Sequence, residues 1–364
     1  MKIKQIEIYR FSIPIVPFVI ATGTMDFAQN VLIRIHTDTG IHGVGECSAF
    51  PMIVGESQET CLAMAKVFAK ILIGKDPLDI PERMNDLMGY ANNATIKSAF
   101  DMALFDISAK RAQQPLYQFL GGQKRIVETD MTIGIDRPET MAKAAIKYQQ
   151  QGCNILKVKL GKNIKEDIER IKQIRAAVGD KMKIRLDANQ GWNFDDALFG
   201  LGKLAEYDIE FCEQPMRTWY DDYLPELNLN SPVKIMADES CYHHHDARKL
   251  INSKSCEYLN IKFAKSGGIL EAQKIHEIAL QTGTKCMIGG MLESRIASTA
   301  NLHFALACPN IVFFDLDTCL LGHLIDPVIG GLTYDGYFLE IPDSPGIGAD
   351  ADPGFLKSCE CFLV

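Results

Sequence analysis

A repeat of short apolar strands and amphipathic helices is the feature that most constrains the fold of this chain. Segments of strand-like composition alternate with helical patterns after residue 122, which is typical of parallel βαβ units. Successive strand ends are about 25 residues apart. A spacing this regular favours a closed (β/α) barrel over an open doubly wound sheet, which normally carries a glycine-rich phosphate turn after its first strand. We expect strands near residues 130–133, 155–159, 184–187, 209–213, 234–238, 258–262, 286–289 and 311–315.

The residues before and after this repeat have a different pattern. Apolar positions alternate near Ile3 and again near Ile33, which predicts a small antiparallel sheet, and the period becomes helical from residue 56 to 120. Beyond residue 320 the chain is rich in Gly, Asp and Pro, so we expect it to fold back over the first domain. The predicted organisation is an α+β domain at 1–120, a barrel domain at 121–320 and a returning segment at 321–364.

Composition narrows the class of protein. The formal net charge is −8, with the acidic residues spread along the chain, which argues against nucleic-acid binding. The sequence has no apolar run long enough to cross a bilayer and no convincing cleavable signal, so we expect a cytoplasmic protein without a membrane partner. The 11 cysteines follow no disulfide or zinc pattern and are expected to be reduced. The sequence leaves open whether the protein forms a homo-oligomer.

Three carboxylates end consecutive predicted strands: Asp187, Glu213 and Asp238. In a barrel the carboxyl ends of the strands carry the chemistry, so these side chains would converge there. Unpaired carboxylates at such short range repel one another unless a cation neutralises them, and three hard oxygen ligands suit Mg²⁺. The alternative is that each acid is simply paired with a nearby lysine or arginine.

Two lysines would flank this arc of carboxylates. Lys159 ends the strand before it and Lys262 ends the strand after it, so the two would face each other across the metal. A lysine acts as a base only if its pKa is lowered, and we expect Lys157, Lys265 and Mg²⁺ to lower it. With a base on each face, one lysine removes the α-proton of a carboxylate substrate and the other returns it, while Mg²⁺ stabilises the enediolate. The alternative is that the lysines only balance the acids.

These motifs together resemble the enolase superfamily, in its muconate lactonizing enzyme subgroup, and within it the dipeptide epimerases. The resemblance spans nearly the whole chain. It implies a (β/α)₇β modified TIM barrel under an N-terminal α+β capping domain that the C-terminal segment completes, one Mg²⁺ per subunit, and Lys159 and Lys262 as the two bases. The motifs are Lys157-Val158-Lys159, Asp187-Ala188-Asn189, Glu213-Gln214-Pro215, Ala237-Asp238-Glu239-Ser240, Asn260-Ile261-Lys262, Gly267-Gly268 and Asp315-Leu316-Asp317.

The resemblance also implies a dipeptide as the substrate. Dipeptide epimerases use an Asp-x-Asp motif for the substrate's N-terminal amine, which falls here on Asp315 and Asp317, and Thr132 and Lys157 fit substrate-binding positions. The alternative is that the two aspartates cap the following turn.

Capping loops near residues 18–25 and 50–56 are expected to close the site. Relatives that prefer Ala-Glu carry an arginine where this chain has Gly23, so we expect a small or hydrophobic C-terminal residue, as in Ala-Ala or Ala-Val.

The predicted activity is therefore that of an isomerase that epimerises Ala-Xaa dipeptides, with salvage of cell-wall peptides as its setting. The alternatives within the subgroup are an o-succinylbenzoate synthase, an N-acylamino acid racemase and a cycloisomerase. A non-catalytic binding protein that kept the barrel is the alternative from another class.

Overall fold

The computed structural model describes residues 1–21 and 23–364. In this part of the chain, eight parallel strands form one sheet in the order β12-β11-β10-β9-β8-β7-β6-β5. The main-chain N–H of Asp130, just before β5, donates to the carbonyl of Phe314 in β12 at 3.1 Å, which joins the two ends of the sheet. The strands are β5 (Met131–Ile133), β6 (Ile155–Lys159), β7 (Lys183–Asp187), β8 (Ile209–Glu213), β9 (Ile235–Ala237), β10 (Tyr258–Ile261), β11 (Lys285–Gly289) and β12 (Ile311–Asp315).

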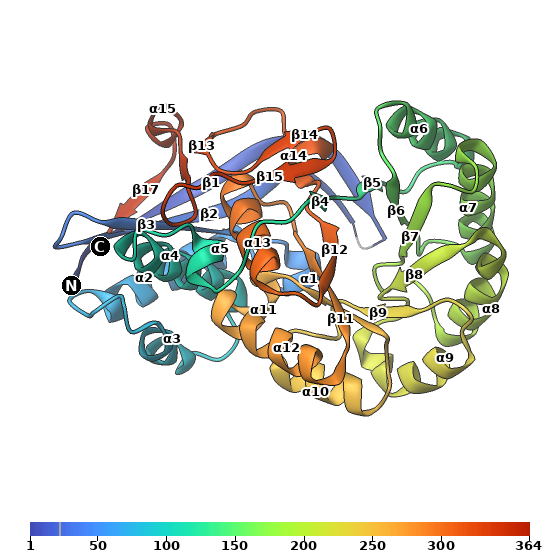
Figure 1. Ribbon diagram of the computed structural model, residues 1–364, viewed down its shortest axis with the longest axis horizontal. Helices are drawn as coiled ribbons and strands as arrows, with labels where there is room; N and C mark the ends of the chain where they lie inside the picture. The colour runs from blue at the N-terminus through green and yellow to red at the C-terminus, as the bar shows by residue number, and fades with distance from the viewer. Residues whose placement is uncertain (22) are drawn as a thin grey trace.

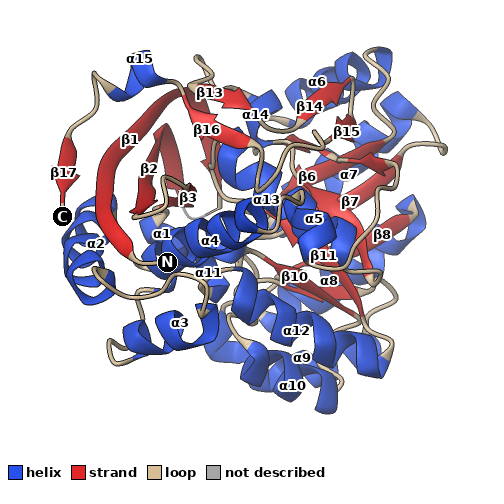
Figure 2. Ribbon diagram, turned by 60° about the vertical axis from the view of Figure 1, so that its left-hand side comes forward, coloured by secondary structure: helices blue, strands red, loops and turns tan. Residues whose placement is uncertain are grey.

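Helices connect the strands and cover the outside of the barrel, as Figure 2 shows in blue around the red strands. Their starts follow from capping side chains: Asn163 accepts from the main chain of α7 and Asn193 from that of α8. The covering helices are α6 (Pro138–Gln150), α7 (Ile164–Val178), α8 (Phe194–Leu204), α9 (Leu224–Asn230), α10 (His244–Asn252), α12 (Ile269–Thr282) and α13 (Arg295–Ala307), with the single turn α11 (Phe263–Ser266) before α12.

The N-terminal part is an antiparallel sheet packed on helices. Its strand order is β17-β1-β2-β3, with β1 (Ile3–Ile20), β2 (Gly23–Thr37), β3 (His42–Ser48) and β17 (Cys361–Leu363). Helices α2 (Gln58–Leu72), α3 (Ile80–Met88) and α4 (Ala94–Arg111) follow. Gly45 lets β3 lie directly on α4, because a Cβ there would be 1.9 Å from the carbonyl oxygen of Ala99.

The C-terminal segment returns to this N-terminal sheet. Glu7 of β1 pairs with Leu363 of β17, and Figure 1 shows the red end of the chain beside the blue sheet. The barrel under a capping domain that the C-terminal segment completes is thus confirmed, while the exact division at residues 120 and 320 stays a prediction. The segment also contains α14 (Thr318–Leu321), β13 (Val328–Gly330), β14 (Thr333–Asp335), β15 (Phe338–Glu340), β16 (Ala349–Ala351) and α15 (Pro353–Leu356).

Buried carboxylates of the capping domain tie it to the barrel. Asp101 of α4 accepts hydrogen bonds from the main-chain N–H groups of Ile269 (2.5 Å) and Leu270 (3.3 Å), at the first turn of α12. Glu46 of β3 accepts in the same way from Ser294 (2.9 Å), the residue that precedes α13. These acids satisfy donors that a helix start leaves without partners, so they fix the cap over the barrel mouth.

The connection between β1 and β2 differs from expectation. Residues 18–25 were expected to be a loop, but Val19 pairs with Thr24 and Ile20 with Gly23 in the antiparallel ladder. The segment is therefore the end of a long hairpin, and Thr22 lies outside the described residues. Apolar residues continue along β1 as far as Ile20, and their cross-strand packing extends the ladder.

None of the helices in the described ranges is long and apolar enough to cross a membrane.

Candidate active site

An apolar layer fills the barrel below the charged strand ends. Phe211, Met236, Tyr258 and Met287 form a buried cluster, and Phe313 packs against it. Side chains alternate along a strand, so the inward-facing residues two positions further on lie above this layer. Those residues carry the polar and charged groups Glu213, Asp238, Asn260 and Asp315, with Lys157, Lys159 and Asp187 from the neighbouring strands.

Lys157 lies at the centre of the carboxylates. Its Nζ is 2.7 Å from an oxygen of Glu213, 2.7 Å from one of Asp315 and 3.2 Å from one of Asp187. Lys159, two residues on, contacts Asp187 at 2.6 Å. Lys157 is fully buried and does not line the cavity described below, so it faces the acids from beneath.

Lys262 approaches the acids from the other side. Its Nζ is 2.8 Å from Asp238 and 4.0 Å from Glu213. Gly289, at the end of β11, leaves the space that this side chain needs, because a Cβ there would be 2.9 Å from Cε of Lys262. Asn260 donates to Glu213 at 2.7 Å and thereby fixes the orientation of that carboxylate.

Each predicted metal ligand therefore contacts a lysine, as the salt-bridge alternative expected. The ammonium groups of Lys157 and Lys262 bridge Glu213 to its neighbours Asp187 and Asp238, which is where a divalent cation would neutralise the same oxygens. The donor set consists of three hard carboxylates from adjacent strands. The residues present therefore fit Mg²⁺.

The carboxylates and the lysines of the site shift one another's pKa values. Burial acts to raise the pKa of Asp187, but Lys159 and Lys157 outweigh it and hold the value at about 2. Burial and the charge of Asp187 raise the pKa of Glu213 to about 7. For Lys262, burial acts to lower the pKa, yet Asp238 and Glu213 outweigh it and the pKa is raised. In the metal-free site the acids thus outweigh the neighbouring lysines, and the lowered pKa that Mg²⁺ is expected to cause stays a prediction.

A cavity lies above these strand ends. Six of the predicted site residues line it: Thr132, Lys159, Asp238, Lys262, Asp315 and Asp317. Asp187 and Glu213 lie beneath it with Lys157. An apolar part of its wall is formed by Ile20 of the hairpin, Ile53 of α1 (Pro51–Val54) and Phe50, which directly precedes α1. Both capping segments therefore reach the cavity.

Gly23 itself does not line the cavity. A Cβ at this position would be 2.0 Å from Sδ of Met52 in α1, so the thioether occupies the space that a side chain would need. The hairpin and α1 are thus in direct contact at this glycine.

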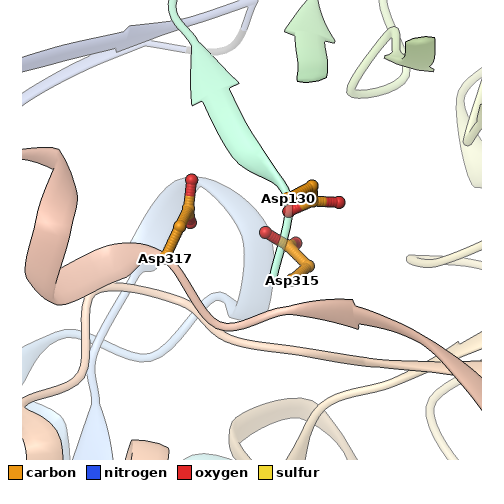
Figure 3. Close-up of side chains that lie close together, drawn as sticks. All are labelled: Asp130, Asp315 and Asp317. Carbon is orange, nitrogen blue, oxygen red and sulfur yellow. The ribbon is translucent and has the colours of Figure 1, made fainter. Parts of the chain in front are cut away.

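A second group of acids lies at the end of β12. Asp130, Asp315 and Asp317 each have a carboxylate oxygen within 4.8 Å of the other two (Figure 3). Asp317 precedes α14, yet its side chain makes no cap and accepts instead from the main-chain N–H of Thr132 at 2.6 Å. The alternative that Asp317 caps the following turn is therefore wrong.

Two residues at the site were not predicted. Glu239 is buried and lines the cavity, and neither carboxylate oxygen has a hydrogen-bond partner among the described residues. Glu239 directly follows the predicted metal ligand Asp238, and this position could have indicated that it belongs to the site. Asp130 was also missed, although it lies two residues before Thr132 and so shares the inward face of its strand.

The chain as a whole is similar to known proteins. Residues 5–121 match the family described as mandelate racemase / muconate lactonizing enzyme, N-terminal domain, and residues 140–354 match the one described as enolase C-terminal domain-like. The chain is 41% identical to the D-Ala-D/L-Ala epimerase of Cytophaga hutchinsonii, with 100% of both chains covered. It is 39% identical to the hydrophobic dipeptide epimerase of Enterococcus faecalis, with 96% of this chain and 99% of the relative covered.

A solved structure is similar over the full length. The dipeptide epimerase from Cytophaga hutchinsonii, complexed with Mg and the dipeptide D-Ala-L-Val, aligns with a TM-score of 0.99 at 40% identity, and 100% of each chain is covered. These relatives are named for epimerisation, which is a reaction of the isomerase class.

Proposed function

Because the chain belongs to the mandelate racemase / muconate lactonizing enzyme family of the enolase superfamily, we propose that it is a Mg²⁺-dependent dipeptide epimerase. The predicted family and the isomerase class are confirmed by its relatives. The observation that carries the finer proposal is that Lys159 and Lys262 line one cavity from strands on opposite sides of Glu213. A base on each face of one α-carbon is what inversion through proton transfer requires.

The two lysines move the proton. In the proposed reaction one neutral amine takes the α-proton of the substrate's C-terminal residue at its Nζ, and the ammonium of the other lysine delivers a proton to the opposite face. Asp238 and Glu213 raise the pKa of Lys262, so this lysine becomes an effective base only when another cation neutralises these acids.

Asp187, Glu213 and Asp238 would hold the Mg²⁺, one ion per subunit. When bound, the ion supplies positive charge that favours ionisation of the substrate's α-C–H bond and replaces the lysine charge beside the acids. Asn260 would keep Glu213 oriented through its 2.7 Å hydrogen bond.

Asp315 and Asp317 would bind the substrate's N-terminal ammonium. One oxygen of Asp315 is engaged by Lys157 at 2.7 Å and one of Asp317 by the N–H of Thr132 at 2.6 Å. Both side chains also line the cavity, so each can present its second oxygen to an ammonium group. Lys157 would act on the substrate indirectly, by holding Asp315.

A small or hydrophobic C-terminal residue is the proposed preference. The cavity wall formed by Ile20, Phe50 and Ile53 is apolar, and Met52 fills the space beside Gly23. A glutamate side chain would find no cation in this wall, whereas alanine or valine would lose no hydrogen bond there.

The proposal is tested by ¹H NMR of LL-dipeptides with the protein and Mg²⁺ in D₂O. We expect the C-terminal α-proton signal of Ala-Ala to disappear as the diastereomer appears, faster than for Ala-Glu. No exchange with any dipeptide would refute the epimerase proposal. Exchange with N-acylamino acids, or dehydration or ring closure of cyclohexadiene or muconate acids, would then point to the racemase, synthase or cycloisomerase alternative.

A further inference from the structure

One buried carboxyl group has no part in the function proposed above. Asp130 lies between β4 (Val127–Glu128) and β5 and is 0% exposed. Its Oδ2 accepts from Arg185 at 2.8 Å, and its Oδ1 has no hydrogen-bond partner within the described ranges. It does not line the cavity. A buried carboxylate oxygen without a donor is costly, so its retention needs a reason other than the ion pair with Arg185.

The position of Asp130 points to the ammonium site. Its carboxyl group lies beside that of Asp315 at the end of β12, with Asp317 on the other side (Figure 3), and oxygens of all three lie within 4.8 Å of one another. Asp315 and Asp317 face the cavity, whereas Asp130 stands behind them. Any charge on Asp130 therefore acts on a cation held by the other two acids.

The nearby cations are shared with other acids. Lys157 contacts Asp315 but also Glu213 and Asp187, at 2.7 and 3.2 Å. Arg185 is likewise divided, because its Nε contacts Glu210 at 2.8 Å while its NH1 group contacts Asp130. Burial and mutual repulsion accordingly raise the pKa of Asp130 and of Asp317, and an ammonium group bound beside them would relieve that repulsion and favour their ionised forms.

We propose that Asp130 is a positioning residue that sets the preference for substrates with a free ammonium group, acting through Asp315. This inference rests on the proposed function. In a buried site, a charge several ångströms from a bound ammonium changes its binding by roughly tenfold. Lys157 neutralises part of the negative charge of Asp315, and the charge of Asp130 would compensate for this loss. The site would therefore select a primary amine over a neutral group in the same place.

The test compares two ligands that differ only in the ammonium group. Ala-Ala carries the ammonium, whereas N-propionyl-alanine has hydrogen in its place. The KM of Ala-Ala for α-proton exchange and the inhibition constant of N-propionyl-alanine against that exchange are measured for the natural protein and for Asp130→Asn. We expect Asp130→Asn to weaken Ala-Ala by roughly tenfold and to change N-propionyl-alanine by less than about twofold.

Equal changes for both ligands, or no change for either, would overturn the proposal and leave Asp130 as the partner of Arg185 alone. The double variant Asp130→Asn/Arg185→Gln removes both charges of the buried pair, and it serves if the single variant does not fold; a smaller loss, still confined to Ala-Ala, is expected, because removal of the Arg185 charge offsets part of the effect. Asp106→Asn is the matched control, because Asp106 is also buried and paired with one cation, Lys110 at 2.7 Å, on α4. It should leave the ratio of the two constants unchanged.

A failure of the proposed function can be distinguished from a failure of this inference. If the proposed function is wrong, the natural protein shows no exchange with any dipeptide, whether or not a variant is compared.

Discussion

Lys265→Met is the substitution whose effect on stability follows most directly from the structure. The Lys265 side chain is 0% exposed, and its Nζ is 2.8 Å from Oδ1 of Asp238. The same Nζ donates to three main-chain carbonyls, those of Asp238 at 2.5 Å, Cys241 at 2.8 Å and Asn260 at 2.8 Å. Lys265 thus joins the ends of β9 and β10 beneath the site and holds Asp238 in place.

Methionine has a similar length but no charge and no donor. Removing one partner of a buried ion pair costs about 3–5 kcal/mol. Three carbonyls lose their donor as well, at about 1 kcal/mol each. The expected loss in the free energy of unfolding is therefore about 6–8 kcal/mol, which is comparable to the whole stability of many domains.

The measurement is urea unfolding of the metal-free protein, followed by far-UV circular dichroism and tryptophan fluorescence. Lys110→Met is the control, since Lys110 also contacts a carboxylate (Asp106, 2.7 Å) and a carbonyl (His42, 3.0 Å) but is partly exposed. We expect the control to lose about 1–2 kcal/mol. A loss below about 2 kcal/mol for Lys265→Met would refute the reasoning, because it would mean that water replaces the ammonium group at little cost.

Three further predictions concern catalysis, the metal and pH. Lys159→Ala and Lys262→Ala should each lower kcat for epimerisation by about 10²- to 10⁴-fold, measured by NMR in D₂O; a single inactive variant would point to a one-base reaction. Asp238→Asn should abolish Mg²⁺ binding in isothermal titration calorimetry whereas Asp317→Asn should preserve it, and the reverse result would move the metal to the second acid group. Burial raises the pKa of Asp101 to about 8, so the native state keeps a proton that the unfolded chain releases near pH 4. Stability from this group should therefore be present at low pH and decrease as the pH rises from about 4 to about 8, and Asp101→Asn should remove that part of the pH dependence in urea titrations.

The alternation of side chains along each strand explains why much of the site was predictable. A strand directs every second side chain inward, so a carboxylate or lysine at a strand end is placed by its position in the chain. For this reason Lys159, Asp187 and Glu213 could be assigned to the barrel interior. The strands β6, β8 and β12 also have the predicted bounds.

Contacts between distant segments could not be predicted in this way. Nothing local to Lys157 indicates that its ammonium contacts three acids from three other strands. Nor does the local sequence show that Asp238 and Glu213 outweigh burial and raise the pKa of Lys262 in the metal-free site. The hairpin of β1 and β2 is likewise decided by cross-strand pairing.

Hydrophobic periodicity and strand alternation are local properties of the chain, so the barrel, the family and the residue types at the strand ends could be inferred from the amino-acid order. Which of those residues line the cavity and which lie beneath it depends on the folded arrangement. This arrangement also brought Asp130 beside Asp315 and placed Asp101 at the start of α12. The physical reason is that burial, charge pairing and pKa depend on distances between groups far apart in the chain, and only the closed barrel with its cap sets those distances.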